Sequence, residues 1–183
     1  MKTISTFLII VTAACIISSC SGKKTDDNII TKRIEKKAPS APIKMQEYEQ
    51  TKEVDWLNNT YICKIERAPD DSLKMVKDEN GQLFVDNRIS LAVKRNDGSV
   101  FFKRTFTKKD FSSCLDDDYR NTGILEGLVF DRAEGSDLYF AASVSHPQTD
   151  EYIPLVVRLN RMGNVEISRD TQLDISAIEE EDI

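Results

Sequence analysis

The sequence predicts an all-β fold: an antiparallel up-and-down meander of about seven or eight strands that closes into a small barrel, with one short helical turn. Apolar and polar residues alternate with a period of two in several segments, which is typical of half-buried strands. Turn sequences such as Asn96-Asp97-Gly98 separate these segments and favour hairpins. A meander of this length folds into a sandwich or closes into a barrel, and closure is preferred because it removes exposed strand edges.

The expected strands follow one another along the second two thirds of the chain. In the first of them, Tyr61, Cys63 and Ile65 alternate with polar residues. The clearest segments in chain order are 60–66, 89–94, 100–106, 124–131, 138–145, 153–159 and 165–167. Residues 73–85 add a further irregular strand or two around a turn at 78–81. Residues 108–115 are expected to form the short helical turn, with Asp110 placed to influence its start.

Composition divides the chain into four segments. We expect a lipoprotein signal peptide over 1–19, a lipidated flexible tether over 20–53, the β-barrel domain over 54–173 and an acidic tail over 174–183. The tether carries many charges, few aromatic residues and two prolines, so it cannot bury enough apolar area to offset its ordering entropy.

The N-terminal segment indicates a location. Lys2 is followed by an apolar run that is too short to be a permanent membrane span. The run ends in Ile17-Ser18-Ser19-Cys20, which resembles a bacterial lipobox: an aliphatic residue, two small residues and a cysteine. The resemblance implies that Cys20 is lipidated and becomes the mature N-terminus. We therefore expect an outer-membrane lipoprotein that faces the periplasm or is displayed on the cell surface.

Charge and histidine content exclude some function classes. The chain has 25 Lys and Arg against 31 Asp and Glu, which gives a net charge of −6. This balance argues against a nucleic-acid partner, because such proteins usually present a basic face. The chain has 1 histidine, which disfavours mechanisms that need two imidazoles. No cofactor is expected.

Several segments of the expected barrel together resemble a known family. The segments are Pro69-Asp70-Asp71-Ser72-Leu73, Met75-Val76-Lys77-Asp78, Phe84-Val85-Asp86-Asn87-Arg88-Ile89, Asp97-Gly98-Ser99-Val100-Phe101-Phe102, Leu115-Asp116-Asp117-Asp118-Tyr119-Arg120, Thr122 to Phe130, and Ala141 to Pro147. They resemble small lipoproteins of gut anaerobes that are classified as a domain of unknown function. The resemblance covers most of 54–173 and leaves out the tether and the tail. It implies a lipocalin-like β-barrel, and it implies no activity and no functional residues.

Two cysteines remain in the mature chain besides Cys20. Cys63 and Cys114 form an even pair in an oxidising compartment, where a disulfide would close a loop of about fifty residues and contribute roughly 2–4 kcal/mol. The alternative is that Cys63 is a small buried hydrophobic residue, since it shares a strand face with Tyr61 and Ile65.

Arg104 and Glu126 stand on apolar strand faces by simple alternation. Three interpretations stay open. The two residues form an inward ion pair, they provide a polar anchor in a ligand pocket, or a β-bulge turns one or both outward.

Three further features carry weaker predictions. Asp116, Asp117 and Asp118 form a carboxylate cluster that is a solvated loop or a weak Ca²⁺ site. Asp71-Ser72-Leu73 fits a short pattern for O-glycosylation of Ser72 in some gut anaerobes. His146, at the end of a strand, is expected to be an exposed or capping residue rather than a general base.

These observations lead to a functional hypothesis. We expect a non-enzymatic, lipid-anchored cell-envelope protein that binds a small ligand or a protein partner through its small barrel. One alternative is a structural or assembly accessory with a solid barrel and no ligand, and cavity volume separates these two. The other is an enzyme that uses carboxylates such as those of Asp116 to Asp118.

Overall fold

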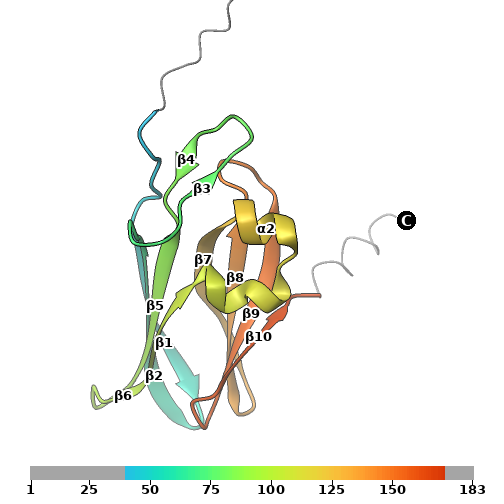
Figure 1. The fold of residues 1–183 in the computed structure, drawn as a ribbon. Helices are drawn as coiled ribbons and strands as arrows, with labels where there is room; N and C mark the ends of the chain where they lie inside the picture. Colours follow the sequence, from blue (N-terminus) through green and yellow to red (C-terminus); the bar gives the residue numbers. More distant parts are fainter. Residues whose placement is uncertain (1–39, 172–183) are drawn as a thin grey trace, which may run out of the picture. The chain divides into compact units, whose positions relative to one another are not determined.

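Two four-stranded antiparallel sheets and a short hairpin form the computed structural model, which describes residues 40–171 (Figure 1). The predicted all-β, antiparallel class is confirmed. The expected signal peptide (1–19), Cys20 and the expected acidic tail (174–183) lie outside the described residues. Within the described part of the chain, no helix is both long enough and apolar enough to cross a bilayer.

The first sheet has the strand order β1-β2-β5-β6. Its strands are β1 (Tyr48–Trp56), β2 (Asn59–Pro69), β5 (Asn87–Arg95) and β6 (Val100–Thr107). The hairpin predicted at Asn96-Asp97-Gly98 joins β5 to β6, with Gly98 at a φ of 83° that glycine adopts without steric cost. β1 turns into β2 through Leu57 and Asn58, whose φ angles of 52° and 60° are also positive.

Most of β1 lies in the segment that was expected to be a flexible tether. Residues 48–53 pair with β2, so the β structure begins before the expected domain boundary at residue 54. The buried residues of β1 are Val54 and Trp56, at its C-terminal end. The other β1 residues are exposed or half-buried on an edge strand, where a polar sequence is tolerated. This polar composition is why the sequence resembles a tether.

The second sheet has the strand order β10-β9-β8-β7. Its strands are β7 (Ile124–Glu134), β8 (Asp137–Ser145), β9 (Tyr152–Asn160) and β10 (Val165–Arg169). The pairing of β7 with β8 shifts at two places, between Leu125 and Gly127 and between Phe130 and Arg132. Each shift is a β-bulge that changes which side chains of β7 point toward the core.

The expected closed barrel is not found in residues 40–171, where the strands form two separate sheets. Continuing the meander would require β6 to pair with β7. Instead η1 (Lys108–Cys114) and α2 (Asp117–Thr122) connect these strands, so β7 starts a second sheet. The helical turn predicted over 108–115 is confirmed as η1, and Asp110 accepts hydrogen bonds from the Thr107 amide (2.9 Å) and hydroxyl (3.1 Å) at its start.

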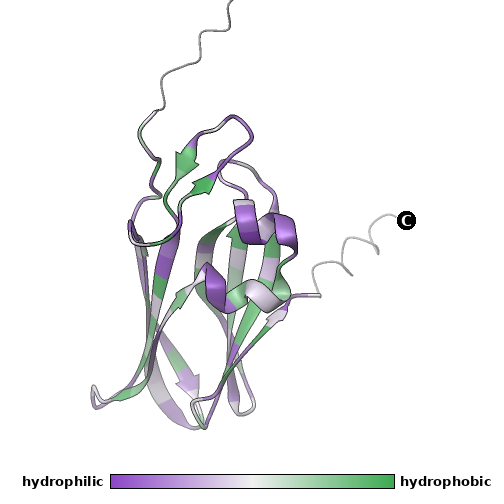
Figure 2. Cartoon of the chain, viewed as in Figure 1, coloured by the Kyte–Doolittle hydropathy of each residue, from purple (hydrophilic) through white to green (hydrophobic). Residues whose placement is uncertain are grey.

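The inward faces of both sheets contribute to one apolar core. Figure 2 shows hydrophobic and hydrophilic residues alternating along the strands. Ile89 and Leu91 of the first sheet and Leu138, Phe140 and Leu159 of the second are all 0% exposed. Side chains of this kind fill the space between the sheets, as expected for a sandwich.

A smaller apolar cluster lies at the end of the sandwich that carries the β3–β4 hairpin. This hairpin consists of β3 (Val76–Lys77) and β4 (Leu83–Phe84). Val76, Phe84 and Ile124 are buried against one another, and Met45 packs on them. Met45 belongs to a strap, residues 40–47, that runs beside β4: the Ile43 amide donates to the Leu83 oxygen (2.9 Å), and the Val85 amide donates to the Ile43 oxygen (2.9 Å).

Candidate functional site

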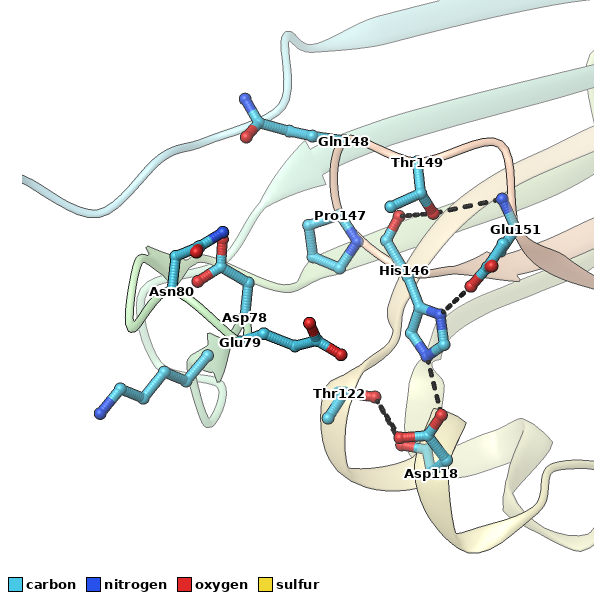
Figure 3. Close-up of a pocket in the computed structure, with 11 residues that line it drawn as sticks. Asp78, Glu79, Asn80, Asp118, Thr122, His146, Pro147, Gln148, Thr149 and Glu151 are labelled. Carbon is cyan, nitrogen blue, oxygen red and sulfur yellow. Dashed lines mark hydrogen bonds and ion pairs between the residues drawn. The ribbon is translucent and has the colours of Figure 1, made fainter.

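A surface pocket of about 520 Å³ lies beside the β3–β4 hairpin (Figure 3). Three separate elements line it: the β3–β4 turn, helix α2 and the loop that joins β8 to β9. The carboxylates in its lining are Asp78, Glu79, Asp118 and Glu151. Lys77 and His146 also line it. We call this feature the acidic pocket. Because its walls come from distant parts of the sequence, the pocket depends on the folded sandwich.

His146 lies at the centre of one wall and is held from three sides. Its ring stacks on Tyr119, with centroids 4.1 Å apart and an interplanar angle of 18°. Nδ1 lies 3.1 Å from Oε2 of Glu151, and Nε2 lies 3.3 Å from Oδ2 of Asp118. The side chain is 18% exposed, so of the two positions expected for His146, exposed or capping, the exposed one is wrong. Its imidazole instead connects α2 with the β8–β9 loop.

The β8–β9 loop is shaped by main-chain and hydroxyl contacts next to this histidine. The His146 amide donates to the Glu151 oxygen (3.0 Å), and the Thr149 amide and hydroxyl both donate to the His146 oxygen (3.3 and 3.1 Å). These contacts present the side chain of Glu151 beside the imidazole. The wall of the pocket is therefore fixed by the turn itself.

The acidic pocket favours a positively charged occupant. Figure 3 shows the Glu79 carboxylate pointing across the pocket toward His146 and Thr122, whereas Gln148 points away from it. Glu79 is exposed, and in the described part of the chain no hydrogen bond or ion pair engages it. The carboxylates of Asp118 and Glu151 are also largely exposed, with side chains 67% and 72% accessible. Such groups keep their hydration and can accept a cation at little desolvation cost.

The weak Ca²⁺ site that was one of two interpretations of Asp116, Asp117 and Asp118 is not assembled among the described residues. The Asp116 carboxylate caps α2 by accepting from the Tyr119 amide (3.0 Å). The Asp117 carboxylate pairs with Arg120 (2.5 Å), and the Asp118 carboxylate accepts from the Thr122 hydroxyl (3.0 Å) and faces His146. The three carboxylates therefore serve three different contacts. Among residues 40–171, no group of three or more His, Cys, Asp or Glu side chains is arranged to hold a metal ion.

A second, smaller cavity of about 220 Å³ adjoins the acidic pocket. Most of its wall is apolar, with Ile43 and Met45 from the strap, Phe84 and Val85 from the hairpin, and Ile124 from β7. Glu126 also lines it. We call it the apolar slot. The slot and the acidic pocket share the residues 146–149 as a common wall.

Comparison with protein families matches residues 27–167 to the family described as Domain of unknown function (DUF4738). The chain belongs to this family. The match begins inside the expected tether, so residues 27–53 are part of the DUF4738 region, which corrects the expectation that the resemblance would leave the tether out. No curated protein matches the chain.

Arg104 and Glu126 of the DUF4738 domain are not partners. Arg104 lies opposite Leu91 in the ladder, on the inward face as predicted, but β6 is an edge strand and the side chain reaches solvent. It forms an ion pair with Asp110 at 2.7 Å. Glu126 lies at the first bulge of β7, and Arg67 is the arginine that donates to its main-chain oxygen. The inward pair is wrong. A β-bulge lies at Glu126, but its side chain is half-buried and lines the apolar slot, so the polar anchor stays a prediction for Glu126.

The two cysteines of the DUF4738 domain are not bridged. Both thiols are free: Cys63 is buried on the inward face of β2, and Cys114 ends η1 with its sulfur 3.6 Å from the Ile167 oxygen. Burial raises the pKa of the Cys63 thiol to about 12. This supports the alternative interpretation of Cys63 as a small core residue.

Ser72 lies in an exposed turn after β2, as a modified residue would require. Its hydroxyl donates to Oδ1 of Asp70 at 2.6 Å, and its amide donates to the same oxygen at 2.9 Å. The turn explains the local Asp-rich sequence without reference to a sugar. Glycosylation of Ser72 stays a prediction.

A buried polar cluster that the sequence did not predict lies between the two sheets. Asp86, whose side chain is 5% exposed, accepts hydrogen bonds at Oδ1 from the amides of Asn87 (2.8 Å) and Leu125 (2.9 Å). Oδ2 lies 3.7 Å from Nζ of Lys108, which donates to the Gly123 oxygen. The Asn87 side chain donates to the Leu125 oxygen at 2.9 Å. We call these residues the inter-sheet clamp, because they join β5 to the start of β7.

Burial dominates the electrostatics of the inter-sheet clamp. It raises the pKa of Asp86 above its ordinary value and lowers the pKa of Lys108, while their mutual attraction opposes both changes. Desolvation therefore disfavours the charged forms of Asp86 and Lys108, and their hydrogen bonds compensate for this cost. Asp86, Asn87 and Lys108 do not line the acidic pocket or the apolar slot. Their contacts are with the main chain at Gly123 and Leu125, at the start of β7. No periodic signal reveals it, because Asp86 lies in the short link between β4 and β5.

Proposed function

We propose that the chain is a lipid-anchored cell-envelope protein that catalyses no reaction and binds a partner with a positively charged group at the acidic pocket. The lipobox-like Ile17-Ser18-Ser19-Cys20 supports the anchor, which would place the protein at the outer membrane, facing the periplasm or the cell surface. The observation that carries the binding role is the pocket of about 520 Å³, with carboxylates from three elements around one histidine.

Two features of the site favour binding over catalysis. Both ring nitrogens of His146 face carboxylates rather than a hydroxyl or thiol nucleophile. The carboxylates of Asp118 and Glu151 are largely exposed to water, which suits the capture of a cationic group from solvent. An open, negatively charged surface is suited to attracting a cationic partner.

The packed core also supports a second candidate. Because side chains fill the space between the sheets, the protein acts through its surface, and a structural or assembly accessory without a small ligand fits this feature as well. This candidate keeps the anchor and the non-enzymatic character. It differs in needing no occupant in the acidic pocket.

Metabolic labelling tests the anchor. Cells that express the full chain are grown with an alkyne analogue of palmitate, and the purified protein is probed for the label. We expect labelling of the natural chain and none in the Cys20→Ala variant. Equal labelling of both would place the lipid elsewhere, and no labelling of the natural chain would overturn the anchor.

Native mass spectrometry tests the binding role. The natural chain is purified gently from its own envelope, beside Glu79→Lys in the acidic pocket and Glu53→Lys on the exposed part of β1 as a control. We expect an extra mass that is lost on denaturation in the natural chain and in Glu53→Lys, and much less of it in Glu79→Lys. Equal native and denatured masses in the natural chain would favour the accessory role.

A further inference from the structure

We infer that the acidic pocket and the apolar slot are two halves of one groove, and that its occupant is a segment of a partner protein in which an aliphatic side chain neighbours a lysine or arginine. This inference rests on the proposed function and names the class of partner. The occupant is a polypeptide, because the groove presents an apolar surface and a negatively charged surface side by side, and neighbouring side chains of a polypeptide can match both.

The two cavities lie on either side of a shared wall. Residues 146–149 of the β8–β9 loop border both of them, so a ligand that passes over this loop can contact both cavities. The slot extends from this wall toward the strap, and the pocket extends toward α2. One extended chain that passes over the wall would place neighbouring side chains in both halves.

The slot supplies an apolar subsite. It is lined mainly by Ile43, Met45, Phe84, Val85 and Ile124. Ile43 is 38% exposed although its main chain is fixed to β4, so an apolar side chain is presented at the surface by a constrained segment. Covering it with an aliphatic group would remove apolar area from water.

The pocket supplies a charge that complements a basic residue beside that aliphatic group. Glu79 points into the space without an ion pair of its own among the described residues, and Asp118 and Glu151 lie on the opposite wall. A lysine or arginine head between them would contact carboxylates from two walls. Its aliphatic stem would lie along the shared wall, as such stems do on apolar surfaces.

Display of random hexapeptides on phage tests the inference with the full, folded chain as bait. Four variants are panned in parallel: Ile43→Asn in the slot, Glu79→Gln in the pocket, and the controls Val100→Asn and Glu53→Gln. The controls change an exposed aliphatic residue and an exposed glutamate away from the groove. Affinities of the enriched peptides are then measured by titration calorimetry.

We expect enriched peptides to carry a lysine or arginine directly beside Leu, Ile, Val or Met. Ile43→Asn should weaken their binding about fivefold, and Glu79→Gln about threefold, whereas both controls should leave it unchanged. Enrichment of basic residues alone, or spermidine binding as tightly as the peptides, would overturn this inference and leave the proposed function standing. Enrichment of apolar residues alone would overturn both. Absence of any enriched peptide, or an equal loss of peptide affinity in the control variants, would overturn the inference that the two cavities form one binding groove.

Discussion

Two clusters of charged side chains in this molecule contain the same kinds of groups in opposite surroundings. The inter-sheet clamp holds Asp86 and Lys108 with side chains 5% and 15% exposed. The acidic pocket holds Asp118 and Glu151 with side chains 67% and 72% exposed around one histidine. The clamp joins the two sheets, whereas the pocket faces solvent beside the β3–β4 hairpin.

The difference shows how burial divides charged residues between folding and binding. Asp86 is removed from water, so the fold must satisfy it with two main-chain amides and an ammonium group. A buried carboxylate with these contacts stabilises one folded structure and is not accessible to a binding partner. The pocket carboxylates are largely exposed, so we expect them to contribute little to stability and to exchange their water for a ligand.

The largest expected effect comes from breaking the clamp. Asp86→Ala leaves the Asn87 and Leu125 amides without their acceptor and leaves Lys108 without its counter-charge, so it should lower the free energy of unfolding by about 3–5 kcal/mol. Urea denaturation followed by far-UV circular dichroism measures this. A loss below about 1 kcal/mol would show that water replaces the carboxylate and that the clamp does not hold the sheets together.

The pH dependence of stability tests the desolvation of Asp86 in the clamp. Burial raises the pKa of Asp86 in the folded state above its ordinary value of 3.8, so its carboxyl favours folding most at low pH, when it is protonated. This contribution is fully present below the unfolded pKa and is lost as pH rises through the folded pKa, at about 1.4 kcal/mol for each unit of difference. The natural chain should therefore lose stability relative to Asp86→Asn as pH rises above 3.8.

Denaturant titrations of the natural chain and Asp86→Asn at a series of pH values check this slope. Asparagine keeps an oxygen that can accept from the two amides but does not titrate. A difference that is constant across the acid range would mean that the carboxyl has the same pKa in both states, which would contradict its desolvation.

An intermediate effect is expected for the edge-strand pair. Arg104 and Asp110 are partly exposed, and the guanidinium also lies over the Phe106 ring at 4.9 Å. Arg104→Ala should lower the free energy of unfolding by about 1 kcal/mol. Glu126→Gln, measured in the same urea titrations, should change it by less. A larger loss in Glu126→Gln than in Arg104→Ala would show that the Glu126 carboxylate contributes more to stability than the edge-strand pair does.

Local patterns in the sequence were sufficient for the parts of the fold that depend on neighbours. Period-two alternation identified the central strands, turn chemistry identified the β5–β6 hairpin, and Asp110 marked the start of η1. Local patterns could not predict whether the sheet closes into a barrel, because pairing of β6 with β7 depends on contacts between residues far apart in the sequence. β1 was missed since residues 48–53 lie on an exposed edge and carry no apolar alternation.

Only single residues of the candidate site could be predicted, because the site is formed by contacts between residues far apart in the sequence. The sequence singled out Asp118 as part of a solvated loop or a weak Ca²⁺ site, and His146 as an exposed or capping residue. Their contact joins residues 28 positions apart through the meeting of α2 with the β8–β9 loop. Asp86 gave no signal at all, since a carboxylate in a short link looks the same in sequence whether it is buried or solvated.

The smallest expected effect is the one that best separates the two clusters. The double variant Asp118→Asn and Glu151→Gln keeps side-chain size and removes both charges beside His146, while the Tyr119 stack and the main-chain contacts of the loop remain. Its free energy of unfolding at neutral pH should stay within about 0.5 kcal/mol of the natural chain, as for most surface substitutions. Urea denaturation beside Asp86→Ala measures the contrast. If the double variant instead lost several kcal/mol, the charges around His146 would be holding α2 against the β8–β9 loop, and the pocket would belong to the architecture of the fold in the same sense as the clamp.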